Sequence, residues 1–572
     1  MKKITLLLIF LITINYSYGQ YNYFGTNLPV GADGITPLNI TPFNGKIYFS
    51  GLFKKTSITA GIYYDRELGY FDPTDNSYGE LANINTIDDF SGYSAPSDFF
   101  EFNGYLYFIA SSGAYGTDRE LYRTDGVTVA LFKDVAPANL SGFPQGSYPQ
   151  FIVMNGKLYF FATSTGSNSQ NSLWQTDGTS TNTINVSNIS FADYADSSKR
   201  SVIVYNNELY FSGYENLGSE LYKFNDASNT TSLVKELFPG VNGGSPRNFT
   251  IFNNKLFFSA YTPGNGGQIN LCKTDGTTTG TTDILDSVLF SNNPNGLIVV
   301  NDKLIYVAFN PNTNAIDLFK CEYNVSLSIY EISLIKHFNP GPNVTPLNVA
   351  QEFILFNGNV YFSTSENSDY LNGDVRQVYK TNGTTSGTIK TITINASQIG
   401  SGLGAFPRNF FIFNGKLCFY MRDSDIFEQL WISDGTNNYL ETLTNVGNGL
   451  PFRPDFIKAV KDNILYISAT SVNPYNGTEL WKIEDTSLLE TETFDNFDKV
   501  FIYPNPTSNI LNIDIQNTSN FETEIYDVVG KKVALFKNQK TVDISNLNNG
   551  MYLIKITDLD TNSSHSQKII KK

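Results

Sequence analysis

This chain of 572 residues contains very few histidines that could act in catalysis. The only histidines are His337 and His565, so a Ser-His-Asp triad in the main part of the chain would have to use His337. His337 stands where Asp134 and Glu236 stand in other copies of a repeat, after a short apolar run. We therefore interpret His337 as a polar residue at a strand end and predict no catalytic histidine.

The chain also contains few of the cysteine and histidine residues that bind transition metals. The cysteines Cys272, Cys321 and Cys418 are too few and too scattered for a disulfide framework or a zinc site. Cys272 and Cys418 replace aromatic residues of the repeat, so we expect both to be buried and inert. Calcium stays open because acidic and carbonyl oxygens are plentiful, but the acidic stretches at 72–76 and 423–425 fit plain turns better. We predict no metal site and, calcium aside, no cofactor.

Carboxylates are the remaining groups that could act as acid and base. A pair of them would suffice for an extracellular polysaccharide lyase or glycoside hydrolase. Glu120, Glu220 and Glu479 recur at one repeat position, which indicates a structural role, whereas Asp98 and Glu352 carry no such constraint. The sequence places no two of them at a catalytic separation. We predict no catalytic residue and keep the carboxylate enzyme as the alternative function.

These residues must be positioned by a repeat of about 50 residues between 44 and 485. One phrase, as in NGKLCF at 414–419, occurs nine times, with a degenerate last copy, and a second, as in ELYRTDG at 120–126, follows a little later. Asn-Gly and Asp-Gly between alternating apolar residues indicate tight hairpins. Another short strand precedes the first phrase and one follows the second. Each unit is thus predicted to contain four short strands, two hairpins and two longer loops.

Four-stranded units repeated radially are typical of a β-propeller. The predicted fold class is all-β: a β-propeller of eight or nine four-stranded blades over residues 20–485, with an open β-solenoid as the alternative. The last unit lacks a good fourth strand near residue 485. Residues 21–24 could supply that strand and close the ring.

The second phrase, as in ELW at 479–481, resembles the ELWxxDGT repeats of large secreted bacterial proteins. The resemblance covers about residues 30–485 and implies little about activity. In a propeller the two hairpin turns would lie on one face and the more variable connections on the other. Because function concentrates on variable loops held by a rigid scaffold, we predict that the variable face binds the ligand.

A Pro-x-Asn or Pro-x-Asp pattern precedes the innermost strand of several units, as at 246–248 and 407–409. In a propeller these residues would ring the mouth of the central channel, where they could bind sugar hydroxyls or a cation. The alternative is that Asn or Asp caps a turn before the strand. The candidate ligand-binding residues are Asp98, Arg247, Asn248, Asn348, Arg408 and Asn409.

The first 19 residues have the pattern of a secretory signal peptide. Lysines at 2 and 3 precede an apolar run at 4–14, and a small-x-small pattern predicts cleavage between Gly19 and Gln20. The run is too short for a membrane span, and no later stretch reaches the required length. No cysteine follows the cleavage point. We expect an exported chain with no lipid anchor and no transmembrane segment.

Composition changes after residue 485. An acidic, threonine-rich linker at 486–497 leads to residues 498–572, whose seven or so short alternating segments predict a small Ig-like antiparallel β-sandwich. Its most specific positions are Pro504, Asn505, Pro506, Gly530, Gly550, Tyr552, Lys571 and Lys572. With them the segment resembles the C-terminal sorting domain of the type IX secretion system of Bacteroidetes. The resemblance implies export across the outer membrane by the type IX machinery, removal of the domain, and either surface attachment or release.

The net charge of −15 argues against nucleic acid and anionic membranes as partners, because both require clusters of lysine and arginine. We therefore expect a monomeric binding or adhesion protein, attached to the cell surface or released, with an extracellular glycan or protein as ligand. A structural adhesin of the surface layer or of motility is a third class.

Overall fold

The computed structural model describes residues 21–25, 35–137, 139–166, 171–191, 201–215, 218–263, 267–284, 292–338, 352–364, 377–392, 407–422, 428–436, 440–442, 453–472, 475–485, 501–515, 520–527, 531–559 and 564–572. The predicted signal peptide with Gly19 and Gln20, the linker, Asn348, Gly530 and the stretch 423–425 lie outside them. The chain separates into two compact units, one of residues 21–485 and one containing the C-terminal strands.

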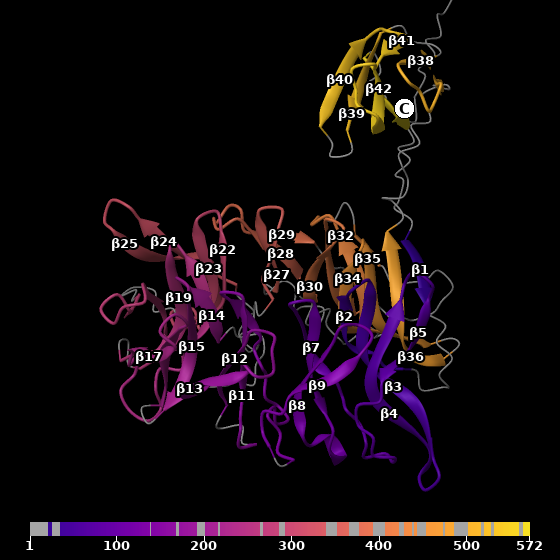
Figure 1. Ribbon diagram of the computed structural model, residues 1–572. Coiled ribbons are helices and arrows are strands. Elements are labelled where there is room, and N and C mark those ends of the chain that lie inside the picture. Colours follow the sequence, from indigo (N-terminus) through magenta and orange to yellow (C-terminus); the bar gives the residue numbers. More distant parts are fainter. Residues whose placement is uncertain are drawn as a thin grey trace, which may run out of the picture. The chain divides into compact units, whose positions relative to one another are not determined.

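The described parts of residues 21–485 contain nine groups of four antiparallel strands that follow one another along the chain (Figure 1). Seven groups are separate sheets, and the third and fourth join through β13 and β15 into one sheet of eight strands. Within a group, strands adjacent in sequence are generally adjacent in the sheet, because tight turns connect antiparallel neighbours. The described part has one short helical turn, η1 (Ala114–Gly116).

The first five groups share this order of strands. They are β2 Leu38–Phe43, β3 Lys46–Ser57, β4 Gly61–Asp72, β5 Ser77–Ala82; β6 Ser97–Phe102, β7 Tyr105–Ser111, β8 Arg119–Thr124, β9 Val129–Lys133; β10 Ile152–Met154, β11 Lys157–Ala162, β12 Ser172–Thr176, β13 Ile184–Phe191; β14 Val202–Tyr205, β15 Glu208–Glu215, β16 Gly218–Asn225, β17 Thr230–Lys235; and β18 Arg247–Phe252, β19 Lys255–Tyr261, β20 Ile269–Thr274, β21 Thr282–Asp283.

The last four groups continue the pattern. They are β22 Asn292–Val300, β23 Lys303–Asn310, β24 Ala315–Asn324, β25 Ile329–Lys336; β26 Ile354–Phe356, β27 Asn359–Thr364, β28 Gln377–Thr381, β29 Ile389–Ile392; β30 Arg408–Phe413, β31 Lys416–Arg422, β32 Glu428–Ser433, β33 Leu440–Thr442; and β34 Arg453–Lys461, β35 Ile464–Val472, β36 Tyr475–Asp485 with β1 Tyr21–Gly25. We call the first strand of each group (β2, β6, β10, β14, β18, β22, β26, β30 and β34) its leading strand.

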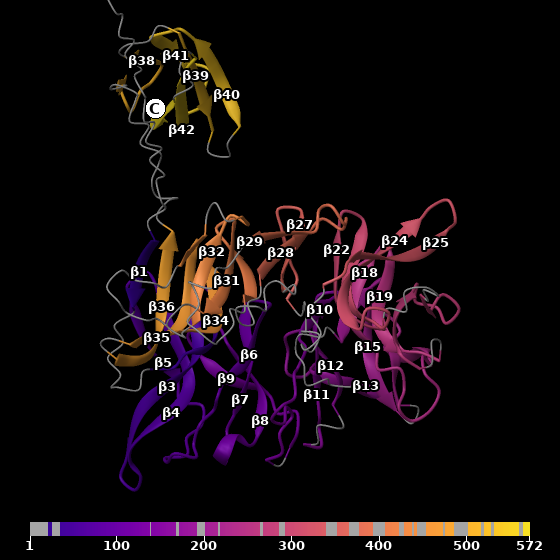
Figure 2. The ribbon, with the colours of Figure 1, turned by 180° about the vertical axis from the view of Figure 1, so that it is seen from behind.

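The ninth group is completed by the opposite end of the repeat region. β1 pairs antiparallel with β36, from Tyr21 opposite Asp485 to Gly25 opposite Trp481. Figure 2 shows the indigo β1 beside the orange β36. This pairing confirms the fourth strand that the sequence predicted from residues 21–24.

The repeated phrases form the turns predicted from them. In the Asn-Gly turns both residues have positive φ, as at Asn414 (47°) and Gly415 (68°), a region that asparagine and glycine tolerate best. In the Asp-Gly turns the aspartate is occupied locally. The Oδ1 atom of Asp275, for example, accepts the backbone N–H of Thr277 at 3.0 Å and its hydroxyl at 2.7 Å. The Asp275 carboxylate therefore stabilises its own turn.

Several Asn-Gly turns contact the Asp-Gly turn of the following group. The side-chain amide of Asn44 donates to the carbonyl oxygen of Asp125 at 3.1 Å, and the amide of Asn103 donates to that of Asp177 at 3.2 Å. The hydroxyl of the buried Tyr48 adds a bond of 3.3 Å to the carbonyl of Gly126. Both kinds of turn therefore lie on the same side of the groups.

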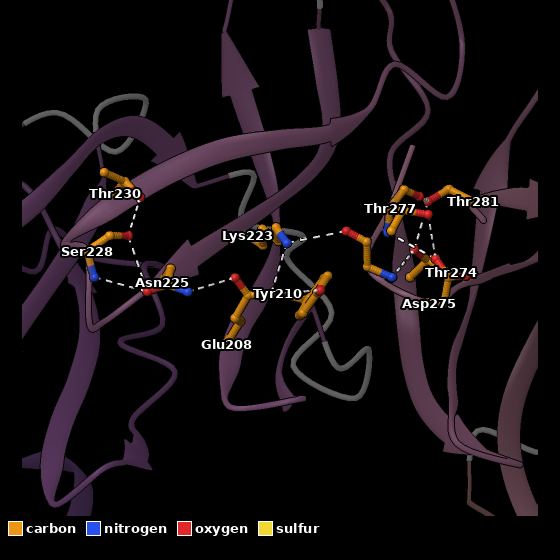
Figure 3. A network of polar contacts seen from close by, with 11 residues as sticks. Glu208, Tyr210, Lys223, Asn225, Ser228, Thr230, Thr274, Asp275, Thr277 and Thr281 are labelled. Atoms are coloured by element: carbon orange, nitrogen blue, oxygen red, sulfur yellow. Dashed lines mark hydrogen bonds and ion pairs between the residues drawn. The ribbon is translucent and has the colours of Figure 1, made fainter. Parts of the chain in front are cut away.

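Figure 3 shows the junction between the fourth and fifth groups. The Nζ atom of Lys223 donates to Glu208 at 2.9 Å and to the carbonyl oxygen of Gly276 at 3.3 Å. Tyr210 donates its hydroxyl to the same Glu208 at 3.2 Å. A Cβ atom at Gly276 would lie 2.5 Å from this hydroxyl, and φ there is +94°. Glycine is therefore required at this position both for backbone conformation and for the close approach of the next group.

The apolar core lies between neighbouring groups. Tyr48 and Leu68 of the first group pack in one cluster with Leu106 and Phe108 of the second. Such sharing is expected, since a single small sheet cannot bury both of its faces alone.

The ninth group also contacts the first. Ile47 and Phe71 of the first group share a buried cluster with Tyr466 and Leu480 of the ninth. The leading strands β2 and β34 lie against each other. Contacts between successive groups therefore run through the chain and return to its beginning.

The C-terminal unit consists of two sheets around one core. Strands β37 (Phe501–Tyr503), β38 (Ile510–Asp514) and β41 (Thr541–Asp543) form one sheet, and β39 (Phe521–Tyr526), β40 (Lys532–Lys537), β42 (Gly550–Asp558) and β43 (Ser564–Lys571) form the other. Leu511 and Ile513 of the first sheet pack with Ile525 and Ile554 of the second. The arrangement is that of two antiparallel layers.

We expect Gly276→Ala to destabilise the protein by about 3 kcal/mol, because the methyl group meets the Tyr210 hydroxyl and a non-glycine residue is strained at this φ. Gly358→Ala is the control: its φ is +70° and the space around its Cβ is open, so only the strain of about 1 kcal/mol remains. The measurement is the free energy of urea unfolding. Equal losses in the two variants would show that the junction is not tight.

Candidate functional site

The start of the leading strands has one recurring backbone feature. Asn39, Asp98, Asn248, Asn293 and Asn409 all have φ between 53° and 60°. The pairing of each of these strands with its neighbour shifts at this point, which marks a β-bulge. Asn and Asp are the non-glycine residues most tolerant of this conformation. The Pro-x-Asn pattern thus has a backbone role, although by a bulge and not by a simple turn cap.

Side chains at these bulges connect one group to the next. The amide of Asn39 donates to the carbonyl oxygen of Pro96 at 3.2 Å, and that of Asn248 donates to the carbonyl of Pro294 at 3.4 Å. Ser259 reinforces the second contact with a hydroxyl bond of 2.6 Å to Pro294. The bulges therefore hold successive leading strands together.

A cavity of 460 Å³ lies along the leading strands of the fourth, fifth and sixth groups. Such a volume is within the usual range of ligand sites. It is lined by Ile203, by Asn248, Phe249, Thr250 and Ile251 of β18, by Asn295, Gly296, Leu297, Ile298 and Val299 of β22, and by Phe353, just before β26. We call this cavity the hollow.

The hollow is lined by both polar and apolar side chains. The hydroxyl of Thr250 donates to the carbonyl of Leu297 at 3.2 Å, which joins β18 to β22. Asn248 is 8% exposed and its amide is directed at Pro294. Ile251 is 45% exposed in spite of its apolar side chain. The arrangement suits binding of a ligand by shape and main-chain contacts.

The other predicted binding residues are distributed over separate groups. Arg247 adjoins Asn248, and its Nη2 atom donates to Asn293 at 3.3 Å. Asp98 is the second residue of β6. The hydroxyl of Ser97 donates to the Asp98 carboxylate at 2.7 Å, and burial raises the pKa of Asp98. Arg408 and Asn409 begin β30, and the N–H of Asn409 donates to Glu352. Among the described members of this set, Asn248 alone lines the hollow.

Sequence reasoning missed the apolar part of the lining. Ile251 and Leu297 follow the same alternation as residues of the core, so no pattern in the sequence distinguishes them. Asn293 carried a weak signal, since its proline follows it instead of preceding it. The Asn293-Pro294 pair could have indicated that β22 begins like β18 and lies beside it.

The recurring glutamates are buried anchors for the loops between groups. Glu120 accepts the backbone N–H groups of Val135, Ala136 and Gly142 at 2.6, 3.4 and 2.7 Å. Burial raises the pKa of Glu120 to about 8, although these three donors lower it. A carboxylate occupied by its own loop is poorly placed to act on a substrate.

Glu220 repeats this arrangement in the fourth group. It accepts the N–H groups of Leu237, Phe238 and Gly244 at 2.6, 3.3 and 3.1 Å, and burial raises its pKa to about 7. The position is therefore structural, as its recurrence in the sequence indicated.

His337 belongs to the same kind of anchor. In the sixth group the buried Asp317 takes the glutamate position and lies 2.7 Å from the Nδ1 atom of His337. The Asp317 carboxylate also accepts the backbone N–H of Phe338 at 3.1 Å. Among the described residues no serine is bonded to this pair. The bonds from His337 and Phe338 to Asp317 hold the segment that follows β25.

The cysteines and acidic turns offer no metal centre in the described part of the chain. Cys272, Cys321 and Cys418 are buried free thiols. The Oδ1 atom of Asp72 accepts the N–H and hydroxyl of Thr74 at 2.9 and 2.6 Å, which makes the 72–76 stretch a plain turn. No group of three potential metal ligands is found within the described ranges.

The candidate sorting residues meet at the last strand of the C-terminal unit. The Asn505 amide donates to the carbonyl of Lys568 at 2.7 Å and accepts the N–H of Ile570 at 2.9 Å. Lys571 is 7% exposed, whereas Lys572 is exposed. Asn505, with Pro504 and Pro506 beside it, thus holds the strand that carries the C-terminal lysines. Gly550 begins β42 opposite Lys571 of the last strand, and Tyr552 lies opposite Ile569. The hydroxyl of Tyr552 donates to the carbonyl of Asn548 at 2.8 Å.

Comparison with known proteins places the C-terminal unit in a family. Residues 501–572 match the model of the secretion system C-terminal sorting domain. The domain identifies the chain as one secreted by the type IX route to the cell surface or the extracellular space, and implies interaction with the type IX machinery. No helix in the described ranges is both long and apolar enough to cross a membrane.

Three further similarities extend to other proteins. The chain is 28% identical over 118 residues to an endo-acting ulvan lyase of Formosa agariphila, a match that covers 20% of this chain and 22% of that protein. It is similar to PorZ, a surface component of the type IX secretion system of Porphyromonas gingivalis, at 11% identity over 94% of this chain and 75% of that one, with a TM-score of 0.35. A puromycin-hydrolyzing peptidase of Mycobacterium tuberculosis is similar at 9% identity over 56% and 48% of the two chains, with a TM-score of 0.36.

We expect the buried glutamates to make stability depend on pH. Because the folded pKa of Glu120 is raised to about 8 from the usual 4.5, the folded state keeps a proton that the unfolded chain loses. The free energy of unfolding should therefore fall as pH rises from about 4.5 to about 8. Glu120→Gln should flatten this dependence, as read from the thermal midpoint at several pH values, whereas Glu101→Gln, at an exposed glutamate of the same group, should not. Parallel profiles for all three proteins would contradict the assignment.

Proposed function

We propose that residues 21–485 form a nine-bladed β-propeller, and that the exported protein is a binding or adhesion protein with an extracellular glycan or protein as its ligand. The contacts that run from each group to the next, and from the ninth back to the first, support a closed ring. In that ring the leading strands are innermost and β1 completes the last blade. The candidate binding residues Asp98, Arg247, Asn248, Asn348, Arg408 and Asn409 would then lie at the channel mouth.

The observation that carries the binding proposal is the hollow. It combines a volume suited to a ligand, a hydrogen bond that joins two of its strands, and an exposed apolar residue, Ile251. Exposed apolar residues beside a cavity commonly mark interaction sites. The hollow lies on strands held by both neighbours, so it would be formed before a ligand arrives.

A carboxylate enzyme is the second candidate, favoured by the partial similarity to an endo-acting ulvan lyase. Against it, the buried Glu120 and Glu220 are occupied by backbone donors of their own loops. Incubation of the secreted protein with ulvan and a panel of other polysaccharides distinguishes the two functions. Release of reducing ends or unsaturated products would favour the enzyme.

The binding proposal predicts that Ile251→Lys lowers binding at least tenfold, because the new charge and length would fill the hollow. Ile412→Lys is the matched control, since Ile412 holds the same repeat position in the eighth group and is 44% exposed. Binding of the labelled proteins to arrays of extracellular polysaccharides and surface proteins provides the measurement. Equal binding by the two variants would place the ligand elsewhere.

Removal of residues 501–572 should abolish export, because the chain then lacks the sorting domain that the type IX machinery recognises. Asn505→Ala should reduce export less completely, since it releases only two hydrogen bonds of the last strand. The amounts of each protein in the periplasm and on the cell surface, measured by blotting, provide the test. Normal export of the shortened chain would overturn the role of the domain.

A further inference from the structure

One outer face of the C-terminal unit departs from the usual pattern of two antiparallel layers. In such a fold the strand residues that point away from the core are generally polar. Ile554 and Ile556 of β42 are fully buried in the core. Met551 and Leu553 of the same strand point to the opposite face, because side chains alternate along a strand, and each is 47% exposed. The outer face of the sheet of β40, β39, β42 and β43 therefore presents apolar side chains to solvent.

These apolar residues adjoin one another across three strands. Ile570 of β43 is 37% exposed and lies opposite Met551. Tyr526 of β39 lies opposite Leu553. Residues directly opposite in antiparallel strands share a face, with their Cβ atoms about 4.5–5.5 Å apart. We call Tyr526, Met551, Leu553 and Ile570 the outer patch. Single exposed apolar residues are common, but an adjoining set marks an interaction surface.

The outer face of the other sheet in this unit differs. It also carries two exposed large side chains, Tyr503 and Ile510. They do not lie opposite each other, since Tyr503 pairs with Asn512 and Ile510 pairs with Asp543. Apolar residues that adjoin in register thus distinguish the first outer face from the second.

The outer patch lies within the segment that the secretion machinery recognises. The family match at residues 501–572 includes all of its strands and implies an interaction with the type IX machinery. Protein interfaces commonly have an apolar and aromatic centre with a polar rim. Lysines supply such a rim here: Lys532 lies opposite Tyr526, and the exposed Lys568 lies opposite Leu553 on the other side. The rim charge favours a partner with acidic groups beside an apolar surface.

We propose that the outer patch is the surface by which the type IX machinery binds the sorting domain. The contacting component of the machinery presents an apolar surface that covers Met551, Leu553 and Ile570, and an acidic group that faces Lys568. The sorting role assigns recognition to the domain as a whole, whereas the outer patch assigns it to one face of one sheet.

A test of the patch is export of full-length variants. Leu553→Gln should lower the amount of protein on the cell surface about tenfold, because a polar side chain replaces a central apolar contact. Leu553→Ile keeps the face apolar and should be exported normally. Ile510→Gln is the matched control, since Ile510 is 49% exposed on the outer face of the other sheet. Blotting of periplasmic and surface fractions gives the amounts, and urea unfolding of each purified full-length protein should show equal stability.

A second measurement leaves the outer patch unchanged and reports on its partner. Benzoylphenylalanine replaces Lys568 or, as a control, the exposed Asp514 of the other sheet, and cells are irradiated during secretion. We expect a crosslink from position 568 to a component of the type IX machinery, absent from cells that lack the machinery, and no such crosslink from position 514.

Three results would overturn the inference. They are equal export of Leu553→Gln and Ile510→Gln, equal crosslinking from both positions, and a crosslink from position 568 to a second copy of the chain or to the repeat region instead of the machinery. If removal of residues 501–572 abolished export while Leu553→Gln was exported normally, the sorting role of the domain would stand and this face would be rejected.

Discussion

The structure depends on one constraint: each four-stranded group needs its neighbour to bury its apolar face and to accept the hydrogen bonds of its turns. One group alone would expose both faces of a small sheet and leave its turns without partners. In the assembled region the Asn44 amide finds its acceptor at Asp125, and Tyr48 is buried against Leu106 and Phe108. The repeated phrases are therefore contact surfaces as well as turns, which explains why they vary so little along the chain.

The local part of this fold could be predicted from the sequence. Asn-Gly and Asp-Gly turns with alternating apolar residues indicate hairpins for reasons of backbone conformation, and the incomplete last unit pointed to residues 21–24 as its missing strand. The site was less accessible. Asn248 could be selected because it belongs to the recurring Pro-x-Asn pattern. Ile251 and Leu297 could not, since their exposure depends on how the sheets meet and not on residue type.

Glu120 and Glu220 illustrate a second limit of reasoning from residue chemistry. Carboxyl groups with strongly raised pKa values often mark catalytic sites. Here the cause is burial under a connecting loop, and the hydrogen-bond donors are the N–H groups of that loop. The same residue type at the same repeat position has thus been selected for holding the chain where one group passes to the next.

The pairing of β1 with β36 has a consequence for the folding and processing of the protein. It joins positions 21 and 485, so β1 can gain its partner only when nearly the whole repeat region is present, and such distant contacts form slowly. The junction ends before the C-terminal unit begins. Proteolysis between the two units would therefore detach the sorting domain without opening the sheet that unites the two ends of the repeat region.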